Sequence, residues 1–127
     1  FRKQKNSYTG MPGRWILLGG YIILKTEAKG GFEHALEPDS WNPNFSPIQT
    51  WLATEILREI KFTDKSHPLI RGILDYLGSG KDFNGHFWLN IIDSNDNYPH
   101  ASWWNTKSRG VHDDYNPTAC LAGFIIR

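Results

Sequence analysis

Residues 46–60 read SPIQTWLATEILREI, and this segment carries both a helix start signal and a helical repeat of apolar residues. Ser46 is a favourable N-cap, and Pro47 follows at the first helical position, where a proline loses no hydrogen bond. We therefore expect a helix over residues 47–61. Its predicted buried stripe consists of Trp51, Leu52, Ile56 and Ile60.

A second helix is predicted over residues 67–78. Ser66 is its expected cap, Pro68 lies in its first turn, and the glycine-rich segment GSG at 78–80 provides a stop signal. Its predicted apolar face consists of Leu69, Ile70, Ile73, Leu74 and Leu77.

The two ends of the chain also carry helical patterns. A last helix is predicted from Pro117 onward, with Asn116 as its N-cap. Near the start, residues 14–26 contain the longest apolar run, which indicates a buried helix. The pairs Gly19-Gly20 and Ile22-Ile23 leave a strand open there.

The polar loops between these helices give the chain a repeated organisation. A glycine-aromatic motif, a polar loop and a helix that starts with proline occur at residues 30–47 and again at 84–117. This repeat predicts two helical hairpins packed side by side, because one hairpin cannot bury both of its faces. The second loop, residues 81–114, is too long to be a simple connection and indicates a functional role.

Length and composition exclude several classes of protein. The 127 residues predict a single domain over residues 1–127. With 14 Lys and Arg against 13 Asp and Glu, the net charge of +1 predicts no nucleic-acid partner. The apolar runs are too short for a membrane span and lack a signal-peptide cleavage pattern, so we expect a cytoplasmic protein. The single cysteine, Cys120, excludes an intramolecular disulfide.

Five short motifs follow one another along the chain. They are GGFEHALEPD at 30–39, SP at 46–47, HPLI at 67–70, YPHASWWN at 98–105 and NPTA at 116–119. Together they resemble the bacterial proteins described as prenyltransferase and squalene oxidase repeat-like, which are similar to terpenoid cyclases and protein prenyltransferase β subunits. The resemblance implies an all-α fold that is part of an α/α toroid around a cavity. Four helices cannot close such a ring, so we expect either further helices or a homo-oligomer.

Two loops of the repeat concentrate the side chains with binding chemistry. The candidate ligand-binding residues are His34, Glu37, Asp39, His100, Trp103, Trp104 and Asn105. Paired carboxylates can hold a cation or act as acid and base, and indoles offer flat apolar surfaces. The alternatives are structural: the carboxylates bond to loop amides, the tryptophans wedge between helices and the imidazole satisfies a carbonyl. We expect the two loops to meet at one end of the helices.

The leading functional hypothesis is an aromatic-lined cavity that binds an isoprenoid-like ligand. The alternatives are a carbohydrate-active or carbohydrate-binding α/α barrel, with indoles stacked on sugar rings, and a helical-repeat scaffold without catalysis. No metal or cofactor is expected, because the zinc and Asp-x-Asp-Asp motifs of the related enzymes are missing from the sequence. The sequence does not decide whether the protein is an enzyme, and no catalytic residue is assigned.

Overall fold

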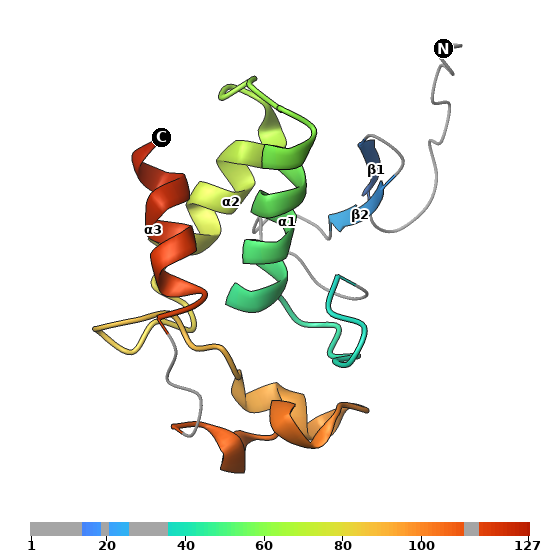
Figure 1. Ribbon diagram of the computed structural model, residues 1–127, viewed down its shortest axis with the longest axis vertical. Coiled ribbons are helices and arrows are strands. Elements are labelled where there is room, and N and C mark those ends of the chain that lie inside the picture. The colour runs from blue at the N-terminus through green and yellow to red at the C-terminus, as the bar shows by residue number, and fades with distance from the viewer. Residues whose placement is uncertain (1–13, 19–20, 26–35, 111–114) are drawn as a thin grey trace.

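The computed structural model describes residues 14–18, 21–25, 36–110 and 115–127. Within these ranges the chain forms a β hairpin, three α-helices and three short 3-10 helices (Figure 1). In chain order the elements are β1 (Arg14–Leu18), β2 (Tyr21–Lys25), α1 (Pro47–Glu59), α2 (Pro68–Gly78), η1 (Asp93–Asn97), η2 (Ser102–Trp104), η3 (Thr106–Ser108) and α3 (Thr118–Ile126).

The helix predicted over residues 14–26 is wrong, because β1 and β2 occupy this segment. The two strands pair antiparallel, with Arg14 opposite Lys25 and Leu18 opposite Tyr21. The physical reason lies in the two residues between the strands, both glycines, which suit a tight hairpin connection and are poor helix formers. Beyond this hairpin, the described residues contain helices and isolated β-bridges, so the helical class is confirmed for that part.

The start of α1 follows the prediction, but its buried face does not. The Ser46 side chain accepts a hydrogen bond from the backbone N–H of Gln49 at 3.2 Å, which makes it the N-cap. The residues of the predicted stripe are half-buried, and Trp51, Ile56 and Ile60 pack against the core from its edge. The buried side chains of α1 are instead Pro47, Ile48, Gln49, Thr50, Ala53, Thr54 and Leu57.

Threonine explains why the face was misjudged. The Thr50 hydroxyl donates to the Ser46 carbonyl at 2.8 Å, and the Thr54 hydroxyl donates to the Trp51 carbonyl at 2.7 Å. Because both hydroxyls are satisfied within the helix, these two short side chains can be buried at little cost. The indole of Trp51 is half-buried and packs against the core.

The caps of α2 and α3 each differ by one residue from the prediction. For α2, His67 is the cap, since its Nδ1 accepts from the backbone N–H of Leu69 at 3.1 Å. The expected cap Ser66 instead donates its hydroxyl to the Asp64 carboxylate at 2.7 Å. For α3, the cap is Pro117 rather than Asn116, and no side chain caps the helix.

The three α-helices share one hydrophobic core. Its buried members are Ala53, Leu57, Leu69, Ile73, Tyr76, Leu77 and Leu121. α1 and α3 run in the same direction and contact one another, and α2 runs in the opposite direction (Figure 1). The described helices are therefore arranged up, down and up, as neighbouring helical hairpins require.

Candidate functional site

The two loops predicted to meet do lie side by side. The backbone N–H of Trp41 donates to the Pro99 carbonyl at 3.0 Å, and the N–H of Ala101 donates to the Asp39 carbonyl at 2.8 Å. Ser40 and His100 form an antiparallel β-bridge between these two bonds. We call residues 36–44 and 93–108 the paired loops.

A buried amide network joins the paired loops below this bridge. The Nδ2 group of Asn42 donates to Ser94 Oγ and to Asn95 Oδ1, both at 2.8 Å. Asn42 Oδ1 accepts from the backbone N–H of Asn44 at 2.9 Å, and Asn95 Nδ2 donates to the Trp104 carbonyl at 3.1 Å. Asn42 and Asn95 are buried, so this network fixes the relative position of the two loops.

In the first loop, the Glu37 carboxyl accepts a hydrogen bond from the Asp39 backbone, and Glu37 is also tied to α1 through its own N–H. The N–H of Glu37 donates to Gln49 Oε1 on α1 at 3.0 Å. Burial raises the pKa of the Glu37 carboxyl, the Asp39 N–H that bonds to it lowers the pKa, and the nearby Asp39 charge raises it again. Asp39 itself is exposed. His34 lies outside the described residues.

In the second loop, two of the predicted polar groups also contact backbone. His100 Nδ1 lies 2.6 Å from the Tyr98 carbonyl, and Asn105 Oδ1 accepts from the N–H of Lys107 at 2.9 Å as the cap of η3. The two tryptophans differ. Trp104 is half-buried, and its Nε1 is buried without a hydrogen-bond partner, whereas Trp103 is 51% exposed.

The described residues hold no group of three or more His, Cys, Asp or Glu side chains able to bind a metal ion. In the same part of the chain, no helix is long and apolar enough to cross a membrane.

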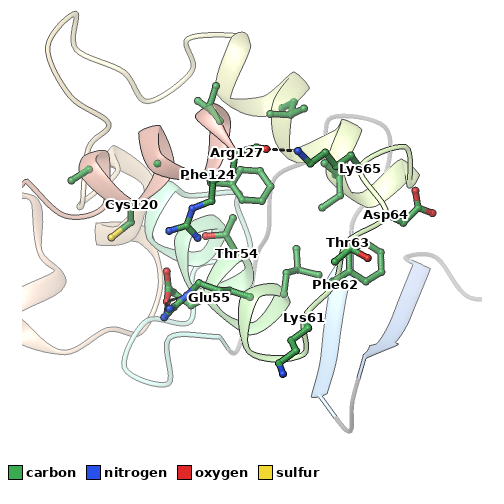
Figure 2. A pocket seen from close by; sticks show the side chains of 17 residues that line it. Thr54, Glu55, Lys61, Phe62, Thr63, Asp64, Lys65, Cys120, Phe124 and Arg127 are labelled. Atoms are coloured by element: carbon green, nitrogen blue, oxygen red, sulfur yellow. Dashed lines mark hydrogen bonds and ion pairs between the residues drawn. The ribbon is translucent and has the colours of Figure 1, made fainter.

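A second candidate site lies at the other end of the helices. The C-terminal half of α1, residues 61–65, α2 and α3 enclose a cavity of about 650 Å³, which we call the groove (Figure 2). Its apolar lining consists of Leu57, Phe62, Ile70, Leu74, Phe124 and Ile125. Gly123 and Cys120 also line it from α3. The described members of the predicted site do not contribute to this lining.

The rim of the groove carries more cations than anions. Arg58, Lys61, Lys65 and Arg127 line it, together with Glu55 and Asp64. The Glu55 carboxylate is paired with Arg58, whose Nε lies 3.0 Å from Oε2. The Asp64 carboxylate accepts from the hydroxyl and the N–H of Ser66, and these bonds hold its pKa below the usual value. Neither lysine forms an ion pair with a described residue, and Lys65 Nζ donates to the carbonyl oxygen of Arg127 (Figure 2). The cations therefore outnumber the anions on the rim, which makes it electropositive.

The sequence did not point to the groove, because its lining comes from three helices and one connection. Phe62, Lys61 and Lys65 belong to the segment between the first two predicted helices, which carries no binding motif. Two residues of the apolar face predicted for 67–78 line the groove. Ile70 also packs against the core, whereas Leu74 is 40% exposed.

Comparisons of the chain with protein-family models, curated proteins and solved structures find no match. The class that can be stated is that of the fold: a helical protein whose described helices α1, α2 and α3 pack in alternating directions around one core.

Proposed function

We propose that the groove binds an isoprenoid-like ligand, in a protein of the prenyltransferase-like and terpenoid cyclase-like α/α toroid type. The alternating directions of α1, α2 and α3 support the toroid part of the proposal, because such rings are built from hairpins whose equivalent helices are parallel neighbours. The five sequence motifs that carry the resemblance support it as well.

The size and the lining of the groove support an isoprenoid-like ligand. Its volume of about 650 Å³ lies within the range of about 300–1,000 Å³ that is usual for small-molecule sites. Two phenylalanine rings, Phe62 and Phe124, and four aliphatic side chains provide the apolar surface that a branched hydrocarbon chain requires. Burying each methylene of such a chain contributes about 0.8 kcal/mol.

The electropositive rim favours a ligand with an anionic head. Lys61 and Lys65 are exposed at the edge of an apolar lining, where an ammonium group attracts a phosphate oxygen more strongly than it would in open water. The ligand we propose therefore places its hydrocarbon chain against Phe62 and Phe124 and its head group near the two lysines. The proposal is one of binding, and it assigns no catalytic residue.

Cys120 provides a direct test of this proposal. It is the only cysteine of the chain and it lines the groove, so a bound ligand should shield its thiol. The measurement is the rate of reaction with a thiol reagent in the presence of farnesyl diphosphate, with and without Mg²⁺. Saturating ligand should slow the reaction by about tenfold or more, since the thiol is then reached only from the free fraction.

Gly123 offers a variant that fills the groove from inside. A Cβ added at Gly123 meets no atom within 4 Å, so the side chain of Gly123→Phe extends into the cavity without a backbone clash. The matched control is Gly78→Phe at the end of α2, where the space is equally open and the groove is not involved. Ligand should protect Cys120 in the control and not in Gly123→Phe.

Two outcomes would contradict the proposal. One is an unchanged reaction rate at all ligand concentrations in a chain whose circular dichroism shows folded helices. The other is equal protection in both phenylalanine variants, which would mean that the ligand acts elsewhere. A scaffold without a ligand site would give the first outcome.

A further inference from the structure

The helix α3 contains a glycine at a place where alanine would make a more stable helix. Gly123 lies inside α3 and is half-buried. A glycine loses more backbone freedom on folding than any other residue, so it lowers the stability of a helix relative to alanine. We therefore looked for the reason in the surroundings of Gly123.

The fold itself does not require a glycine at this position. Glycine is needed where φ is positive, or where a neighbouring segment comes too close for a Cβ atom. The φ of Gly123 lies outside the positive region, and a Cβ built on it meets no packing partner among the described residues within 4 Å. Gly80 and Gly85 differ in this respect, because their φ values of 70° and 97° favour glycine.

The space beside Gly123 belongs to the groove. Gly123 lines the groove next to Phe124, whose ring points into the cavity (Figure 2). Ala119, one turn earlier on the same face of α3, is another small residue of this wall. The missing Cβ of Gly123 thus leaves a recess in the wall that an alanine methyl would fill. We call this recess the notch.

The notch distinguishes hydrocarbon chains by their shape. A straight chain has no side groups, so it lies along the walls of the groove and leaves the notch empty. An empty recess in an apolar wall forfeits dispersion contacts, and a methyl group that enters it restores them. A chain with methyl branches can therefore use the notch, because a branch is the same chemical group as the side chain that glycine lacks.

We infer that Gly123 is a specificity-determining residue of the groove, whose notch receives a methyl branch of the ligand chain. The inference rests on the proposed function, because it concerns the ligand of the same groove. It adds the position at which the groove distinguishes a branched chain from a straight one.

Isothermal titration calorimetry with two probes of equal main-chain length tests the notch. Farnesyl diphosphate carries methyl branches, and dodecyl diphosphate has the same head group and main-chain length without branches. Gly123→Ala should weaken the binding of farnesyl diphosphate about tenfold, because the alanine methyl occupies the place of the ligand branch and overpacks the wall. The same substitution should leave the binding of dodecyl diphosphate unchanged.

The stability of the variant provides a second readout. Gly123→Ala should raise the midpoint of urea unfolding by about 0.3–1 M, since alanine is the better helix former. A loss of affinity in a more stable chain excludes misfolding as its cause. The matched control is Gly78→Ala at the end of α2, where the Cβ position is equally open and the groove is not involved. The control should bind both probes as the unchanged chain does.

The outcomes separate this inference from the proposal on which it rests. If neither probe binds to the unchanged, folded chain, both are wrong. If both probes bind and Gly123→Ala weakens them equally or not at all, the groove remains a ligand site and the notch has no role in selecting the ligand. A lower urea midpoint of Gly123→Ala would also overturn the inference, because the glycine would then serve the fold.

Discussion

Replacing Asn42 by alanine tests whether the amide network holds the paired loops together. The substitution removes the donor to Asn95 Oδ1 and to Ser94 Oγ, each at 2.8 Å, and the acceptor for Asn44. Asn95 is buried, so its oxygen loses a partner that water does not readily replace, at a cost of about 1–3 kcal/mol. The bonds of Ser94 and Asn44, which are more exposed, add about 1 kcal/mol together.

We therefore expect Asn42→Ala to lower the free energy of unfolding by about 2–4 kcal/mol. Urea unfolding followed by tryptophan fluorescence measures this as a decrease in the midpoint of about 1–2 M. Asn44→Ala is the matched control, because it removes the same side chain from the exposed edge of the network, and it should cost less than about 1 kcal/mol. Equal effects of the two substitutions would refute the argument that burial makes this network decisive.

Three further predictions concern the helices and their surroundings. Ile73 is fully buried in the core, so Ile73→Ala should lower the free energy of unfolding by about 2–5 kcal/mol in urea titrations. Ser46→Ala removes the cap of α1 and should cost about 1 kcal/mol in the same assay, whereas Ser46→Asp should restore most of it. Burial raises the pKa of Asp82 above 3.8, so the folded chain holds this proton more tightly than the unfolded chain does. The free energy of unfolding should therefore fall as the pH rises from the unfolded to the folded pKa of this carboxyl. Asp82→Asn should flatten this fall, which is measured as the urea midpoint at a series of pH values.

The positions of the helices could be predicted because the signals are local. Ser46 and Pro47 specify the start of α1 through hydrogen bonding and backbone geometry within a few residues. Gly78 marks the end of α2 in the same way. The helix prediction for residues 14–26 was wrong because the apolar pattern of this segment suits either a buried helix or a strand. The Gly19-Gly20 pair favours the β hairpin of these two alternatives.

The buried face of α2 was largely predicted, because Leu69, Ile73 and Leu77 lie in the core. The buried face of α1 and the groove could not be predicted, because they depend on which side chains meet. Thr50 and Thr54 count as polar in a sequence pattern, yet their hydroxyls bond within α1 and the residues pack inside. Leu74 counts as core and instead lines the groove. The meeting of the paired loops was predictable from the repeat, whereas the Asn42–Asn95 contact that fixes it carries no sequence signature.

The most direct test of ligand binding in the groove is an isotope-filtered nuclear Overhauser experiment. The ¹³C-labelled chain is mixed with unlabelled farnesyl diphosphate, and contacts between ligand methyl protons and protein side chains are recorded. We predict contacts to the rings of Phe62 and Phe124 and to the methyl groups of Leu74. Contacts confined to the paired loops, or none at saturating ligand in the folded chain, would contradict the proposal.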